Sequence, residues 1–179
     1  MWALVESGSV SQIYTHPKQL TIGDVNYPSN IFSMWTSSEL EAIGIYEVVI
    51  DNTNYKDKKY YTNTDQSFAF GSGKVTATYG TATARALADL KTNHCAVIDN
   101  QAYELLQPND WMVVKATETG GSVASDWTTY RAGVRTAAND MKTKINAVSD
   151  VDALAALYVY NNANPPVRPL GEFPDVPTS

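Results

Sequence analysis

The sequence predicts an α+β protein with a β-rich N-terminal part, a helical part and an extended C-terminal tail. Short β-branched and aromatic runs separated by turn residues fill the chain up to Gly80, which is typical of antiparallel strands. After Gly80 the apolar residues recur every three or four positions, which is typical of amphipathic helices. From Asn161 onward the chain holds five of its eight prolines, which fit neither a helix interior nor a central strand. We therefore expect three parts, at residues 1–80, 81–160 and 161–179.

The β-rich part is expected to be a small antiparallel meander around one short helix. In order, its predicted strands lie in a hairpin over 2–14, a hairpin over 20–27 that turns at Gly23-Asp24, and single runs at 45–50, 59–63, 67–70 and 74–80. The helix follows Thr36, which is a suitable N-cap because Glu39 stands three residues later as the partner of a capping box. Gly44 ends it.

The helical part is expected to hold four helices. One long helix covers 81–107, with a kink near Asn93-His94, and Pro108 ends it. A second runs from Asn109 to the Gly120-Gly121 pair. The third begins at Ser125 or Asp126 and carries the clearest apolar stripe, formed by Trp127, Tyr130, Val134, Ala137, Met141, Ile145 and Val148. A last helix begins at Ser149 and packs back on the third.

Composition and charge exclude several classes of function. The net charge is −6 and the basic residues are scattered, which argues against binding of nucleic acid. No apolar run approaches the ~20 residues that span a bilayer, and the N-terminal decapeptide lacks the basic start of a signal peptide. We therefore expect synthesis in the cytoplasm and no membrane contact. The single cysteine, Cys95, cannot form an intrachain disulfide.

No catalytic, cofactor-binding or metal-binding residues are expected. The run Gly71–Lys74 resembles the end of a phosphate loop, but Phe68 and Val75 stand where glycine and Ser or Thr are needed, so a hairpin turn is expected. The loop 51–57 has oxygen ligands at alternate positions but lacks the glycine of a calcium loop. His94 and Cys95 are neighbours on a helix and point about 100° apart. We expect His94 on the helix surface and Cys95 as a small core residue.

The tyrosines of the β-rich part allow an alternative function. Five of them could form a face on which sugar rings stack, as in a carbohydrate-binding module that contacts host glycans: Tyr46, Tyr55, Tyr60, Tyr61 and Tyr79. Tyrosine is also favoured in strands for its packing alone. Whether these side chains lie side by side on one exposed face discriminates between the two interpretations.

Several short motifs carry a resemblance to a known family. They are "WALVESGSV" at Trp2–Val10, "VNYPSNIF" at Val25–Phe32 and "LEAIGIYEV" at Leu40–Val48, then "DWMVVKATETG", "WTTYRAGVR" at Trp127–Arg135 and "VRPLGEFP" at Val167–Pro174. Together they resemble small tail-associated and tail-fibre-associated proteins of tailed bacteriophages, especially marine ones. The resemblance implies a virion structural component or an assembly factor that acts through protein–protein contacts and forms a homo-oligomer or part of a larger assembly. It implies no catalytic residue.

The proline-rich tail is the predicted partner-binding segment. Val167, Leu170 and Phe173 are spaced so that an extended chain could insert them into a groove, and we expect Arg168 to contact the same partner. The groove could belong to another tail or tail-fibre protein or to the chain's own helical part. The first alternative predicts that the chain stays folded without residues 162–179.

Overall fold

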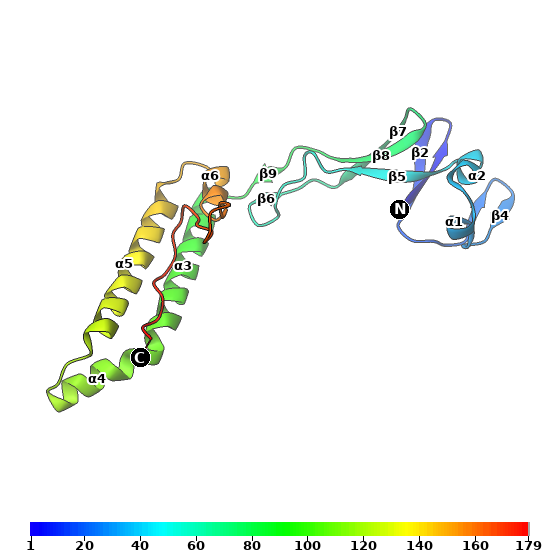
Figure 1. Cartoon of the computed structure of the whole chain (residues 1–179). Helices are drawn as coiled ribbons and strands as arrows, with labels where there is room; N and C mark the ends of the chain where they lie inside the picture. Colours follow the sequence, from blue (N-terminus) through cyan, green and yellow to red (C-terminus); the bar gives the residue numbers. More distant parts are fainter. Residues whose placement is uncertain (179) are drawn as a thin grey trace. The chain divides into compact units, whose positions relative to one another are not determined.

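The computed structural model of the chain describes residues 1–178, and these form two compact units, 1–83 and 84–178 (Figure 1). Strands dominate the first unit and long helices the second, which confirms the predicted α+β class. The proline-rich tail is part of the second unit.

The first unit is built on a five-stranded sheet with strand order β2-β1-β5-β8-β7. These strands are β1 (Trp2–Glu6), β2 (Ser9–Tyr14), β5 (Ile45–Asp51), β7 (Gln66–Gly71) and β8 (Lys74–Tyr79). Both predicted hairpins are present, β1–β2 in this sheet and β3 (Leu20–Ile22) with β4 (Val25–Tyr27) as a separate pair. A second short pair joins β6 (Tyr61–Thr62) and β9 (Thr83–Ala84).

The expectation of an entirely antiparallel meander is wrong at the centre of this sheet. Strand β5 pairs with β8 in parallel, from Val48 opposite Val75 to Asp51 opposite Thr78. Parallel neighbours need a crossover of about a dozen residues or more. The chain between Asp51 and Lys74 supplies one, because it places β6 and β7 before β8 rather than turning straight back.

The two faces of the sheet bury two separate cores. Alternate residues of a strand point to opposite faces, so Ala3 joins one core and Leu4 the other. The edge strands β2 and β7 also contact each other, so the sheet curls. The core that residues of both edge strands share therefore lies inside the curl; its buried members are Ala3, Val48, Val75 and Ala77.

Two short helices and the β3–β4 hairpin cover the outer face. They are α1 (Ile31–Met34), which was not predicted, and α2 (Ser37–Ala42), and they pack around Leu4, Phe32 and Ile45. The predicted capping box is present: Glu39 N–H donates to Thr36 Oγ1, and Thr36 N–H donates to the Glu39 carboxylate. Gly44 ends the segment with a φ of +84°, and a Cβ there would lie 2.9 Å from the Val5 carbonyl oxygen.

The second unit is organised by two long helices, α3 (Leu87–Leu106) and α5 (Ser125–Ala147), which pack along their length. A 3₁₀ turn (Gln107–Asn109) and α4 (Asp110–Thr119) connect them, and α6 (Val151–Ala156) follows α5. Helix α3 begins six residues later than predicted, after β9, and it runs on without interruption through Asn93-His94.

The predicted stripe of α5 is confirmed at its centre, because Tyr130, Val134, Met141 and Ile145 are all buried, while Trp127 is half-buried. On α3 the expectation for His94 is wrong: its side chain is buried and forms a 2.5 Å hydrogen bond with the Tyr158 hydroxyl. Cys95 is only half-buried. The reason is the four-residue spacing of Leu90, His94, Ile98 and Ala102, the buried residues of α3.

A buried cation joins the start of α4 to α5. The Arg131 guanidinium donates to the Asn109 side-chain oxygen, to the Leu106 carbonyl at 3.0 Å and to the Asp110 carboxylate at 2.5 Å. Asn109 is buried as well and donates its own amide to the Leu105 carbonyl. Asn109 is therefore not the side-chain cap that the sequence predicted. Its hydrogen bonds instead hold the backbone in place between the end of α3 and the start of α4.

The capping box gives the first prediction. Hydrogen bonds from the Thr36 backbone and side chain lower the pKa of Glu39. A lowered pKa means that this carboxylate stabilises the fold above the pKa of the unfolded chain, and that the contribution is lost as pH falls through the folded pKa. In an NMR titration, Thr36→Ala should raise the pKa of Glu39 only part of the way to its ordinary range, because it removes the side-chain hydrogen bond and leaves the backbone N–H of residue 36. Equal pKa values in parent and variant would contradict the capping role.

The α3–α5 interface gives the second prediction. Met141→Asp places an uncompensated charge among buried apolar side chains, so it should lower the free energy of unfolding by about 3 kcal/mol or more. Thr136→Asp, at an exposed position of the same helix, is the matched control and should change it far less. Thermal and urea unfolding of the whole chain measure both. A Met141→Asp melt like that of the control would show that the face is wrongly assigned.

Candidate protein-docking site on the helical unit

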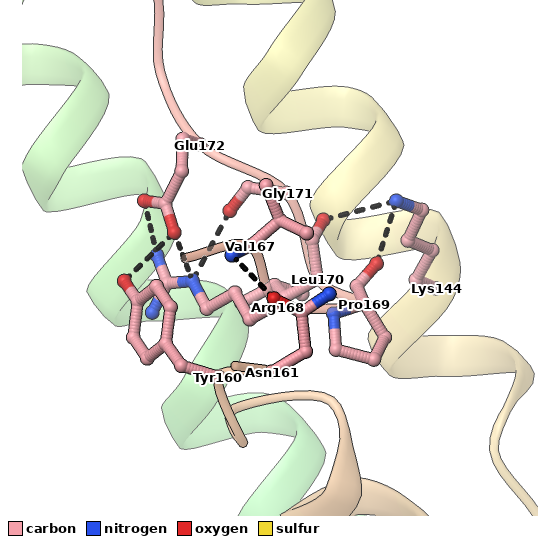
Figure 2. Close-up of polar contacts among 9 residues, drawn as sticks. All are labelled: Lys144, Tyr160, Asn161, Val167, Arg168, Pro169, Leu170, Gly171 and Glu172. Carbon is pink, nitrogen blue, oxygen red and sulfur yellow. Dashed lines mark hydrogen bonds and ion pairs between the residues drawn. The ribbon is translucent and has the colours of Figure 1, made fainter. Parts of the chain in front are cut away.

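The C-terminal tail is anchored to its own helical unit by one buried side chain and by backbone hydrogen bonds. Leu170 is 1% exposed, and its N–H donates to the Leu157 carbonyl at 3.0 Å. From α5, the Lys144 ammonium donates to the carbonyls of Pro169 at 2.8 Å and Leu170 at 3.1 Å (Figure 2). The tail is neither strand nor helix, so its backbone groups need other hydrogen-bond partners. These bonds supply them.

Beyond Leu170 the tail runs in extended conformation along the side of α5. Pro174 lies against Gly133, where an added Cβ would meet the proline ring at 3.3 Å. The tail therefore passes from Lys144 to Gly133 as it advances from Pro169 to Pro174. Eleven helical residues rise about 16 Å, and five extended residues span about the same length. Proline suits this role because it has no backbone N–H and therefore leaves no donor that needs a hydrogen-bond partner.

Asn161 closes the turn between α6 and the tail. Its backbone N–H donates to the Val167 carbonyl at 2.9 Å, and its side-chain oxygen accepts from the N–H groups of Ala163 and Val167. Asparagine is frequent in such turns because its short side chain can imitate a backbone acceptor. The turn brings Val167 back beside the end of the helix.

Arg168 ties the turn to the tail. It forms an ion pair with Glu172 at 2.8 Å and donates to the Gly171 carbonyl at 3.2 Å (Figure 2). Its guanidinium also lies over the rings of Tyr158 and Tyr160. The Tyr160 hydroxyl donates to the same carboxylate at 2.7 Å. This hydrogen bond to Glu172 raises the pKa of Tyr160 above its ordinary value. Gly171, between these residues, has a φ of +98°, a backbone conformation that favours glycine.

These contacts frame an apolar hollow of about 480 Å³ on the surface of the helical unit. Its exposed apolar side chains are Val159, Tyr160 and Val167, and Ala156, Asn161, Arg168 and Pro169 complete the lining. Hydrogen bonds and an ion pair hold the residues around the hollow in place. A surface that is apolar, hollowed and fixed in shape suits the insertion of an apolar side chain from another protein.

The four predicted partner-binding residues lie in different environments. Val167, which is 50% exposed, and Arg168 line the hollow. Leu170 is in the core of its own unit, so in this conformation it is not available to a partner, and Phe173 is half-buried. The burial of Leu170 also argues against the expectation that the chain stays folded without residues 162–179.

The exposed apolar lining residues Val159 and Tyr160 were not anticipated from the sequence. Both residues fall within 81–160, which the sequence predicts to be helical, but the last helix ends at Ala156. The signal was the alternation of valine and tyrosine in "YVY" directly before the asparagines. Tyr158 points inward to His94, so Val159 and Tyr160 are left at the surface.

The tyrosines of the first unit do not form one exposed face. Tyr46 packs on Phe70 inside the curl of the sheet, and Tyr60 is buried. Tyr55 and Tyr79 pack against each other with their rings tilted and the ring centroids 5.0 Å apart. Sugar-stacking platforms need exposed ring faces side by side, and this distribution offers one small pair.

Among residues 1–178, no three His, Cys, Asp or Glu side chains are grouped so that they could hold a metal ion. None of the helices in this range is long and apolar enough to cross a membrane. Comparisons with protein-family models, with curated proteins and with solved structures find no match.

The anchoring of the tail gives the third prediction. Leu170→Ala should lower the free energy of unfolding by about 2–5 kcal/mol, as removal of a buried leucine side chain does. Val167→Ala, three residues away and half-exposed, should cost about 0.5 kcal/mol or less. Urea unfolding followed by circular dichroism measures both. If the two variants were equally stable, the tail would not be part of the core.

Proposed function

We propose that the chain is a non-enzymatic protein of a bacteriophage tail or tail fibre, a virion component or an assembly factor that acts through protein–protein contacts. The observation that carries the proposal is the apolar hollow beside Val159, Tyr160 and Val167, whose shape is fixed by the Arg168–Glu172 ion pair. It is a surface for docking an apolar group, and its lining includes three residues of the tail motif, Val167, Arg168 and Pro169.

The bacteriophage setting rests on the motifs that resemble tail-associated proteins. In the first unit, motif residues Leu4, Phe32, Leu40 and Ile45 share one core. In the second unit, Arg131 of the "YR" motif binds Asp110 of the "DWMVV" motif, and the tail motif supplies Leu170, Arg168 and Glu172. Side chains that must fit one another constrain a sequence together, so the joint occurrence of these motifs supports a shared fold.

Mass spectrometry of purified virions, of the phage that encodes the chain, tests this proposal. Presence in the particle at a fixed ratio to tail proteins is the result expected of a structural component. Absence from the particle, with co-purification on tail or fibre proteins from infected cells, is expected of an assembly factor. A chain that associates with neither would overturn the proposal.

The hollow itself is tested by Val167→Asp combined with Val159→Asp. Both side chains are exposed, so the helical unit should stay folded, while recovery with tail or fibre proteins should fall at least about tenfold. Val176→Asp, which changes an exposed valine outside the hollow, is the matched control. Equal recovery of the double variant and the control would show that docking does not use this surface.

A further inference from the structure

A second hollow of the helical unit, separate from the one beside the tail, is lined by two tryptophans. Trp111 stands on the first turn of α4 and Trp127 on the first turn of α5, and the hollow measures about 310 Å³. Trp111 is 56% exposed and Trp127 is half-buried. Small residues of the lining, Ala116, Gly121 and Ala124, leave the space open. We call this feature the tryptophan hollow.

The residues around the tryptophan hollow are held in place. Arg131 binds Asp110 at 2.5 Å, which ties the start of α4 to α5. At the other end of α4, the Gly121 N–H donates to a backbone carbonyl of that helix at 2.9 Å. The Trp127 ring packs edge-on against Tyr130, with the ring centroids 5.8 Å apart. A site whose walls are fixed beforehand loses little conformational entropy when a ligand binds.

The charge of the tryptophan hollow is positive. Lys115 is the one charged residue among those that line it, and its ammonium lies 5.8 Å from the centroid of the Trp111 ring. Among residues 1–178, no carboxylate forms an ion pair with this ammonium. Asp110, the neighbour of Trp111 in sequence, is already paired with Arg131. A cation without a counter-ion at the edge of a hollow favours an anionic group in the occupant.

The rest of the lining is mostly apolar, so the occupant should combine its anionic group with an apolar body. Indole rings pack well against another aromatic ring, either offset-stacked or edge-on. At about 310 Å³, the hollow is at the small end of ligand pockets, which measure ~300–1,000 Å³. It accommodates one ring with a short acidic arm. A stable protein pair, in contrast, buries ~800 Å² on each partner.

We propose that the tryptophan hollow is a binding site for a small aromatic carboxylate. The ring of the ligand packs on Trp111 and Trp127, and its carboxylate pairs with the Lys115 ammonium. Because this ion pair is open to water, it selects acids over uncharged analogues and supplies only a minor part of the affinity. No residue of the hollow beside the tail takes part, so this inference does not depend on the proposed function.

Binding of 3-phenylpropionate to the full chain tests the site, with the indole N–H signals of NMR spectra as the readout. The chain has four tryptophans; the signals of Trp111 and Trp127 should shift, while those of Trp2 and Trp35 should not. The dissociation constant should be about 1 mM, as expected for a ligand of this size. Trp111→Ala should weaken binding at least about tenfold, while Tyr103→Ala, at an exposed aromatic residue of α3, should leave it unchanged. Circular dichroism verifies that both variants are folded.

The acidic group is tested with 3-phenylpropionamide, which has the same ring and no charge. The parent chain should bind the amide about threefold more weakly than the acid. This difference should disappear in Lys115→Gln and shrink as the salt concentration rises. The proposal is overturned if the Trp111 and Trp127 signals do not move at about 20 mM acid, or if the parent binds acid and amide equally. It is also overturned if Trp111→Ala binds the acid as Tyr103→Ala does.

Discussion

Two helices cannot enclose a core by themselves, and this constraint governs the second unit. Helices α3 and α5 pack along one line, and apolar side chains that flank this line need cover from other elements. Leu154 of α6 and Leu170 of the tail provide the additional cover, and both are almost completely buried. The tail is therefore a structural part of the helical unit, which explains how a proline-rich segment lies in a fixed position.

From this arrangement the surface features follow. Because Leu170 must be held inward, Arg168 and Glu172 form their ion pair outside it, and Asn161 shapes the turn that leads into it. The hollow beside Val159 and Val167 is what that turn leaves open. Helix α4, which connects α3 to α5, has no buried residue. The exposed apolar groups of the hollow and of α4 thus lie outside the core that α3, α5, α6 and the tail form.

Local patterns predicted the fold well where neighbouring residues determine structure. The capping box at Thr36 and Glu39 and the stripe of α5 depend on residues within one or two turns, and both are present. The parallel pairing of β5 with β8 could not be predicted, because it depends on where a long crossover returns. His94 could have been placed: it lies four residues from both Leu90 and Ile98, and its polarity concealed that spacing. Two residues that line the candidate site, Val167 and Arg168, were found from the tail motif. Val159 and Tyr160 were not, since they depend on where α6 ends.

The position of Leu170 also bears on the order in which the protein acquires its structure during translation. Every strand of the five-stranded sheet is complete once Tyr79 has been synthesised, so the first unit can fold early on the ribosome. The helical unit has to wait, because α3 is made some sixty residues before the leucine that covers it. Until then, apolar side chains of α3 and α5 remain accessible to chaperones. The helical unit can therefore complete its core only after α6 and the tail, which carry Leu154 and Leu170, have been made.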